Sequence, residues 1–149
     1  MLKDLIEQNS ATEAVIDECF CLAAAEMEKI TCYDIPKPQF EDPRTLRWRA
    51  DVGIVTDTFR YVLMDGKYCE QCDTYERGIS YHYIGDTADD MVAHLIFEAV
   101  WQYAIHNTVT NDEAELFADK CFSLLDKKYR PYYIRRKTAL QKLKEKGII

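Results

Sequence analysis

The Asp65-Gly66 pair is the feature that most constrains how this chain can fold. Before it, apolar residues alternate with other side chains at Phe59, Tyr61 and Leu63, which is the spacing of a strand. Glycine tolerates the positive φ that a type I′ turn requires, so Asp-Gly between two such runs is a strong signal for a two-residue hairpin turn. The sequence therefore predicts an antiparallel hairpin whose second strand covers residues 68–75.

The hairpin belongs to a longer strand-forming block, residues 48–84. Before the hairpin, Val52, Ile54 and Val55 are β-branched, as strand residues often are. After it, Gly78 interrupts the pattern, and residues 79–84 predict one more strand. We expect an antiparallel meander of three or four strands.

Helical spacing precedes this block. Ser10 and Glu13 have the spacing of a capping box, which predicts a helix over about residues 11–31. Its apolar stripe consists of Ile16, Phe20, Ala23, Met27 and Ile30. Prolines follow at positions 36, 38 and 43 and predict a loop.

Three helices are predicted after the strands. The first begins after a Thr87 cap, with Asp89 and Asp90 in its first turn. Its apolar face consists of Met91, Leu95, Ala99 and Tyr103. Phe97 and Trp101 lie off that face, so this helix is expected to be buried on two sides.

The second of these helices begins at a capping box formed by Thr110 and Glu113. Its expected apolar residues are Leu116, Phe117, Cys121, Leu124 and Leu125. Pro131 suits the first turn of a last helix, which runs to about Lys146 and ends at Gly147. The predicted fold class is α+β, with the meander packed against one N-terminal and three C-terminal helices.

Length and composition favour one soluble globular domain over the 149 residues, of which 48% are apolar and 30% charged. The acidic N-terminus does not resemble an export signal, and no apolar run approaches the ~20 residues that a membrane helix needs. We therefore expect a cytoplasmic protein that does not associate with membranes.

Six scattered cysteines raise the question of metal or redox chemistry, and Cys69 and Cys72 form a C-x-x-C. The predicted turn places Cys69 opposite Val62 and Cys72 opposite Phe59. Residues three apart on a strand point to opposite faces, so the two thiols are not expected to share an ion or a disulfide. Ordinary free thiols are the preferred interpretation. A small metal-binding or regulatory domain that uses Cys69 and Cys72 is the alternative.

Catalytic motifs are not evident. The five glycines form neither a phosphate-binding loop nor a dinucleotide fingerprint, and no serine lies in a nucleophile elbow. His94 is expected on the surface, His106 near a helix end and His82 on a strand, with no metal-ligand spacing among them. We therefore expect a protein without enzymatic activity, cofactor or metal.

Charge is distributed unevenly along the chain. Residues 120–149 carry ten Lys/Arg and two acids, and residues 1–119 carry nine and twenty-four, which gives net charges of +8 and −15. An acidic body argues against nucleic acid as the partner and favours a protein with a basic surface.

Tyrosines and acids are interspersed along the meander, which is typical of a protein-binding surface. The candidate contact residues are Tyr68, Glu70, Asp73, Tyr75, Glu76, Tyr81 and Tyr83. The alternative is that half of the tyrosines face the core, because tyrosine is also a good strand residue.

A family resemblance starts with the run Glu76-Arg77-Gly78 and continues with Thr87-Ala88-Asp89-Asp90, Leu95-Ile96-Phe97 and Tyr103-Ala104. Together these motifs resemble the immunity protein 63 family, whose members occur beside bacterial polymorphic toxin genes. The resemblance implies a non-enzymatic cytoplasmic protein that binds and neutralises one cognate toxin. Among the matching positions, Arg77, Gly78 and Asp90 are interpreted as structural, for instance through an ion pair between Arg77 and Asp90. The alternative for the polar positions Glu76, Arg77 and Asp90 is contact with the toxin.

Overall fold

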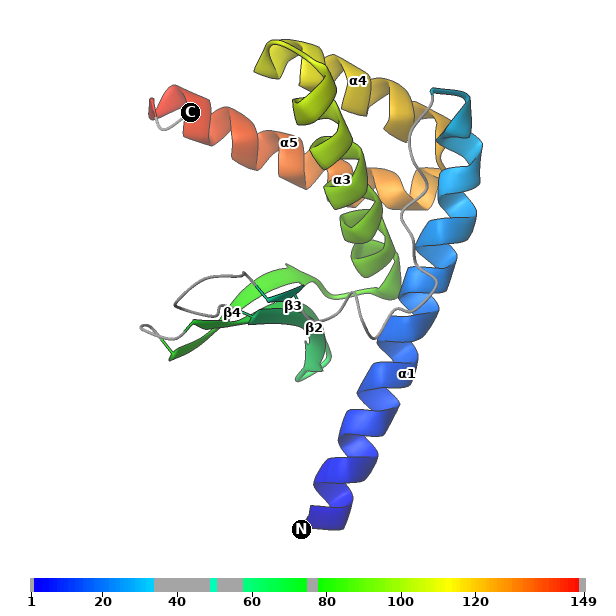
Figure 1. Cartoon of the computed structure of the whole chain (residues 1–149), viewed down its shortest axis with the longest axis vertical. Coiled ribbons are helices and arrows are strands. Elements are labelled where there is room, and N and C mark those ends of the chain that lie inside the picture. The colour runs from blue at the N-terminus through cyan, green and yellow to red at the C-terminus, as the bar shows by residue number, and fades with distance from the viewer. Residues whose placement is uncertain (1, 34–48, 51–57, 75–77, 148–149) are drawn as a thin grey trace. The chain divides into compact units, whose positions relative to one another are not determined.

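A computed structural model describes residues 2–33, 49–50, 58–74 and 78–147, with side chains for 14–30, 61–72 and 78–147 (Figure 1). The chain forms two compact units. The described residues within 1–22 and 39–91 make up the sheet unit, and those within 23–38 and 92–149 make up the helical unit. The mixture of helices and an antiparallel sheet confirms the predicted α+β class. That the whole chain folds as one domain stays a prediction.

The first helix, α1, spans Leu2–Met27 and continues as the 3₁₀ helix η1, Glu28–Tyr33. Its predicted stripe is confirmed, because Ile16, Phe20, Ala23, Met27 and Ile30 are all buried. The predicted start is wrong, because Ser10 lies inside the helix and does not cap it. The residues before Ser10 are mostly Leu, Lys, Glu, Gln and Asp, and most of these favour a helix, so α1 extends upstream of the capping signal.

The sheet has four antiparallel strands in the order β1-β2-β3-β4. They are Arg49–Ala50, Thr58–Met64, Lys67–Thr74 and Gly78–Gly85. Asp65 and Gly66 have φ values of 50° and 76°, as the predicted type I′ turn requires. The register is also confirmed, because Val62 lies opposite Cys69 and Phe59 opposite Cys72.

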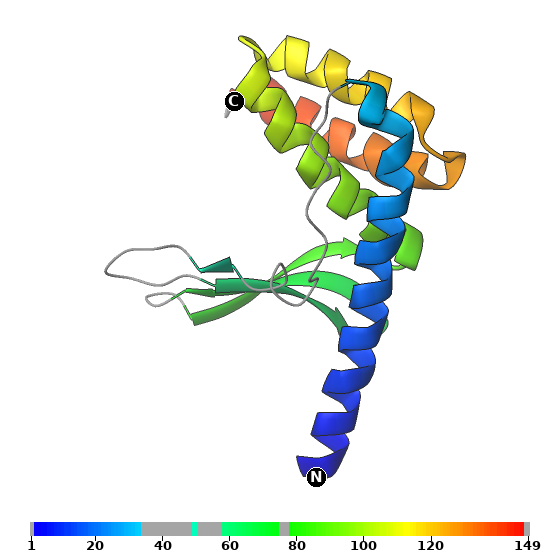
Figure 2. The same ribbon diagram turned by 45° about the vertical axis from the view of Figure 1, so that its right-hand side comes forward.

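Alternation along the strands gives the sheet two different faces. Figure 2 shows α1 running past the ends of the strands. On the α1 face, the rings of Phe20 and Tyr61 lie 5.9 Å apart, and Tyr68 is buried on the same face. Burial raises the pKa of the Tyr68 phenol, and the nearby Cys19 and Glu18 add to this effect. We name the other side the tyrosine face; it carries Cys69 and Gln71 from β3 and Ile79, Tyr81 and Tyr83 from β4.

The helical unit contains most of α3 (Ala88–Asn107), with α4 (Asn111–Leu124), η2 (Lys127–Tyr129) and α5 (Arg130–Glu145). Phe97 is at the centre of its aromatic core, within 6.4 Å, centroid to centroid, of the rings of Trp101, Phe122, Tyr132 and Tyr133. In the same unit, the Asp126 backbone N–H donates to Glu26 at 2.8 Å. Seven consecutive residues, 91–97, are buried, so α3 is covered on more than one side, as predicted.

The starts of α3 and α4 and both ends of α5 follow the predicted signals. The Thr87 side chain accepts from the Asp90 N–H, and the Thr110 side chain accepts from the Glu113 N–H. Pro131 lies in the first turn of α5, and Gly147 follows that helix with a φ of 72°. The stripe predicted for α4 is partly wrong, because Leu116 is 65% and Leu124 41% exposed. Its buried stripe consists of Ala114, Ala118, Cys121, Phe122 and Leu125.

Two expectations lie outside the described residues: the proline loop at positions 36, 38 and 43, and the strand residues 52, 54 and 55. In the described part of the chain, every helix is too short or too polar to cross a membrane.

Candidate functional site

The residues proposed for partner binding do not lie on one surface. Tyr68 is only 7% exposed and Glu70 is half-buried, and both are on the α1 face. The expectation that Tyr68 is a surface contact is therefore wrong, because its ring packs in the core of the sheet unit. Tyr81 and Tyr83 project from the opposite face of the sheet. The alternative interpretation, that some tyrosines face the core, holds for Tyr68.

Several predicted residues cannot be placed. Tyr75, Glu76 and Arg77 lie outside the described residues, and so does the ion pair proposed between Arg77 and Asp90. The backbone of Asp73 pairs with Thr58 and Ile79 at the end of β3, but its side chain is not among those described. Gly78 begins β4 with a φ of 76°.

The tyrosine face exposes three bulky side chains in a row along β4. Ile79 is 56% exposed, Tyr81 48% and Tyr83 55%, and alternation places all three on the same side. The Tyr83 hydroxyl donates to Asp86 Oδ1 at 2.8 Å, and Lys67 Nζ lies 5.9 Å from the centre of its ring. Sequence reasoning missed Ile79, although its spacing from Tyr81 and Tyr83 would have placed it on their face.

Asp90 organises the turn that joins β4 to α3. Its Oδ2 accepts from the Asp86 N–H at 3.2 Å, and the first turn of α3 approaches Gly85 closely. A Cβ at Gly85 would lie 2.3 Å from the Asp90 Cβ, so only glycine fits without a shift. This turn fixes Asp86, and therefore the hydroxyl of Tyr83, at the end of the tyrosine face.

The two cysteines of the C-x-x-C lie on opposite faces of β3, with Cys69 opposite Tyr83 and Cys72 opposite Ser80. Burial raises the pKa of Cys72 to about 11, and its thiol donates to Glu70. Burial also raises the pKa of Cys69. Both groups are therefore thiols at neutral pH, whereas redox and metal chemistry use the thiolate.

In the first helix, Cys19 is buried and Cys21 exposed, so these two thiols do not converge either. Within the described residues, no three His, Cys, Asp or Glu side chains converge to hold a metal ion.

His94 is buried, with 5% of its surface exposed, so its predicted surface position is wrong. Its Nδ1 lies 2.5 Å from the Tyr132 hydroxyl, which Arg136 also approaches; Arg136 pairs in turn with Glu98. Burial, with a contribution from Arg136, lowers the pKa of His94 to about 3. The imidazole is therefore neutral. Because it is buried and its ring packs edge-on against Tyr132 at 5.7 Å between centroids, it has the environment of a structural histidine.

The basic C-terminal segment is partly neutralised within its own unit. Lys137 pairs with Asp119 at 2.8 Å, and Lys144 pairs with Glu115 at 2.5 Å and Asp112 at 3.6 Å. Beside these pairs is an open groove of about 440 Å³. Its lining residues are Glu115, Lys137, Thr138, Gln141, Lys142 and Glu145, which are all polar or charged and carry charges of both signs.

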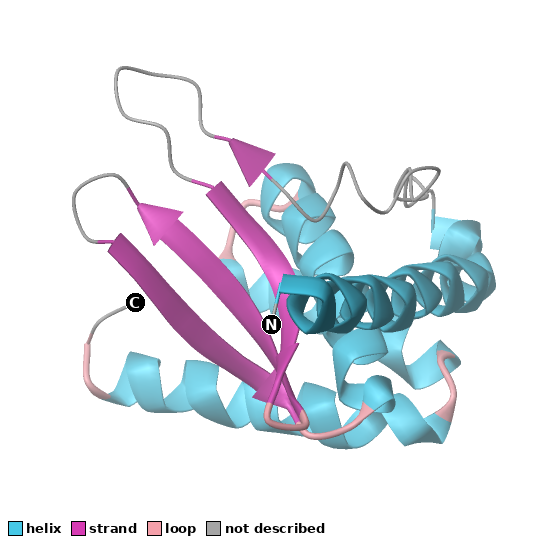
Figure 3. Ribbon diagram, turned by 90° about the horizontal axis from the view of Figure 1, so that it is seen from below, coloured by secondary structure: helices cyan, strands magenta, loops and turns pink. Residues whose placement is uncertain are grey.

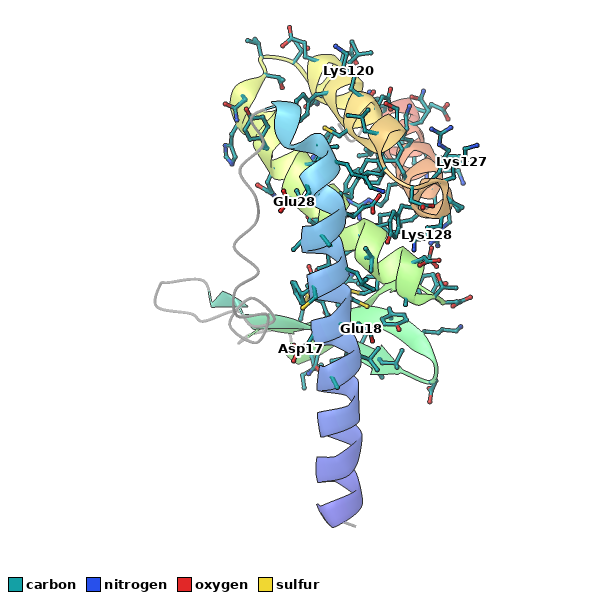
Figure 4. All side chains as sticks on the ribbon, turned by 90° about the vertical axis from the view of Figure 1, so that its right-hand side faces the viewer. Asp17, Glu18, Glu28, Lys120, Lys127 and Lys128 are labelled. Atoms are coloured by element: carbon teal, nitrogen blue, oxygen red, sulfur yellow. The ribbon has the colours of Figure 1, made fainter. Side chains whose placement is uncertain are left out.

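Several charged side chains project outward (Figure 4). Lys120, Lys127 and Lys128 extend from α4 and η2, and Asp17 and Glu18 extend from α1. The basic C-terminal part and the acidic N-terminal part of the chain therefore each present charge to solvent.

No protein-family model, curated protein or solved structure matches this chain.

Proposed function

We propose that this chain is a non-enzymatic immunity protein, which binds one cognate bacterial toxin in the cytoplasm and neutralises it by covering its active site. The tyrosine face is the contact surface in this proposal. The observation that carries it is the half-exposed row of Ile79, Tyr81 and Tyr83 on one side of β4. Large, rigid aromatic side chains of this kind dominate the binding energy of many protein interfaces.

Charge supports a basic partner. Residues 1–119 carry a net charge of −15, and Asp86 lies beside Tyr83 at the edge of the tyrosine face. An acidic body attracts a basic toxin over long range and raises the rate of encounter. The aromatic side chains would then slow dissociation once they are buried in the complex.

Co-expression with the toxin gene that the proposal expects beside the gene for this chain tests this function. The wild-type chain should retain the toxin in a pull-down and restore growth of cells that express it. The double variant Tyr81→Ala/Tyr83→Ala should bind at least ~30-fold more weakly, since truncating an interface anchor typically costs 2 kcal/mol or more.

His82→Ala is the matched control, because His82 is exposed on the same strand but on the opposite face. It should leave binding within about threefold of wild type. Failure of the wild-type chain to bind the toxin or to rescue growth would refute the immunity function. Normal binding by the double variant would refute the tyrosine face as its contact surface.

A further inference from the structure

Strand β4 lies at the edge of the sheet, and most of it is exposed on both faces of the sheet. β4 is the last strand in the sheet order, and Figure 3 shows it at the border of the sheet. Its first six residues, Gly78–Tyr83, are all exposed, so side chains on both faces are uncovered. In the described part of the chain, no strand pairs with this edge. An open edge of this kind is a ready template for another strand.

Prolines and charged side chains, which commonly block such an edge, are absent from β4. Edge strands in monomeric proteins commonly carry lysines, prolines or inward-pointing charges, which prevent pairing with another chain. The segment Gly78–Gly85 contains no proline and no Lys, Arg, Asp or Glu. Its exposed residues are instead a β-branched isoleucine and two tyrosines, which are good strand formers.

The regular part of β4 is symmetric in chemical type about Tyr81. A β-bulge leaves Ile84 without a register partner on β3, and Gly78, although paired with Thr74, has a φ of 76° and is not extended, so the regular extended run is Ile79–Tyr83. Antiparallel pairing with a second copy, related by a two-fold axis at Tyr81, would place Tyr81 opposite its own copy. Ile79 would then lie opposite the second Tyr83, and Ser80 opposite the second His82.

From this symmetry we infer that two copies of this chain pair through their β4 edges, in antiparallel register centred on Tyr81. A second copy is the favoured occupant because every pair in this register is chemically matched. Apolar side chains meet apolar ones on the tyrosine face, and a hydroxyl meets an imidazole on the α1 face. No charged residue lies opposite another, although the whole chain has a net charge of −7.

The dimer joins two tyrosine faces into one continuous surface. This surface stays exposed to solvent, because the two copies pair through the backbone at their strand edges. The contact is short, since the matched run is only Ile79–Tyr83. Such a contact buries less than a standard interface, so we expect a dissociation constant in the micromolar range or weaker, of about 10–100 µM. This inference does not depend on the toxin-binding proposal.

Sedimentation velocity on the purified chain, without any partner, tests the inference at concentrations up to about 0.5 mM. The wild type should convert from monomer to dimer as concentration rises. Tyr81→Lys places like charges opposite each other and should weaken dimerisation at least tenfold. Leu116→Lys is the control, because it adds the same charge at a 65% exposed position on α4 and should dimerise like the wild type.

A charge-swap experiment tests the register itself. Tyr81→Lys and Tyr81→Glu should each be monomeric alone, whereas an equimolar mixture should form a heterodimer. Circular dichroism establishes that each variant is folded. A wild type that stays monomeric overturns the inference, and so does a Tyr81→Lys protein that dimerises normally. Open-ended association would also overturn it, because two-fold pairing closes on itself.

Discussion

At the scale of single residues, His94 shows most clearly how the surrounding protein determines the protonation state of a side chain. Its network includes the Tyr132 hydroxyl, the Arg136 guanidinium and the Glu98 carboxylate. Burial makes the imidazolium unfavourable, and Arg136 adds electrostatic repulsion. The pKa of His94 therefore falls from 6.5 to about 3, so folding favours the neutral ring.

This shift predicts a loss of stability in acid. Below pH 6.5 His94 binds a proton in the unfolded chain, whereas in the folded chain it stays neutral until the pH approaches about 3. The free energy of unfolding should therefore decrease as pH falls through this window, by up to ~1.4 kcal/mol per pH unit for this group.

Denaturant unfolding of wild type and His94→Gln between about pH 7 and pH 4 checks the prediction. Glutamine keeps a polar partner for Tyr132 but does not titrate, so its stability should fall less steeply. Parallel curves for the two proteins would show that His94 does not contribute.

The sequence placed His94 on the surface because it lies away from the stripe of Met91, Leu95 and Ala99. That reasoning assumes that a helix has one buried face. The flanking residues Val92, Ala93, Ile96 and Phe97 are all buried, so no side of α3 is open at this level. The prediction that α3 is buried on two sides already contained the information needed to place His94 correctly.

At the scale of elements, the β2–β3 hairpin depends on its turn. Gly66 has a φ of 76°, and nothing lies within 4 Å of a Cβ added there, so backbone strain is the only cost of a side chain. Gly66→Ala should lower the free energy of unfolding by about 1 kcal/mol. Gly66→Asn is the control and should cost less, because asparagine tolerates positive φ. Chemical denaturation measures both; equal losses would contradict this explanation.

Helix α4 offers a test of its corrected stripe. Phe122 is 4% exposed, and its ring stacks on Tyr133 with 4.2 Å between centroids. Phe122→Ala should lower the free energy of unfolding by about 3–5 kcal/mol. Leu116→Ala should change it by less than ~0.5 kcal/mol, because Leu116 is exposed. Similar effects of the two substitutions in urea unfolding would contradict the stripe seen in the structure.

The difference between the hairpin and α4 shows where sequence patterns succeed. An Asp-Gly turn fixes the register of both strands by geometry alone, so each pair from Thr58 to Met64 follows from it. The stripe of α4 depends on what covers the helix. The prediction chose the large residues Leu116 and Leu124 for the buried face. It therefore missed Ala114 and Ala118, whose small side chains allow close packing.

At the scale of the whole molecule, charge predicts opposite salt responses for the two proposed associations. A basic toxin should bind the acidic chain more slowly as salt is raised, by about tenfold in association rate between about 50 and 500 mM NaCl. Two copies with a net charge of −7 each repel, so dimerisation should strengthen or stay constant over the same range. Stopped-flow binding and sedimentation measure the two responses. A toxin association rate insensitive to salt would remove electrostatic steering from the proposal, and salt-weakened dimerisation would contradict the uncharged interface.

The candidate site could be predicted only in part. Composition identified the tyrosines, and alternation could place Tyr81 and Tyr83 on one face of their strand, although the face of Tyr68 relative to them depends on how β3 pairs with β4. Alternation could not identify which face α1 covers, because that depends on contacts between Phe20 and Tyr61, which are far apart in sequence. The exposure of β4 could not be predicted either. A meander has two edge strands, and the sequence pattern does not show whether another part of the chain covers one of them.

The order of segments along the chain has a consequence for synthesis on the ribosome. Each compact unit combines two separate segments, and α1 and α3 each run from one unit into the other. The sheet unit has all its residues once position 91 is made, whereas the helical unit needs residues 92–149 as well. Ala23, Met27 and Ile30 must therefore wait for the last part of the chain before they can be buried. During that interval the second half of α1 is a nascent apolar segment that chaperones can recognise.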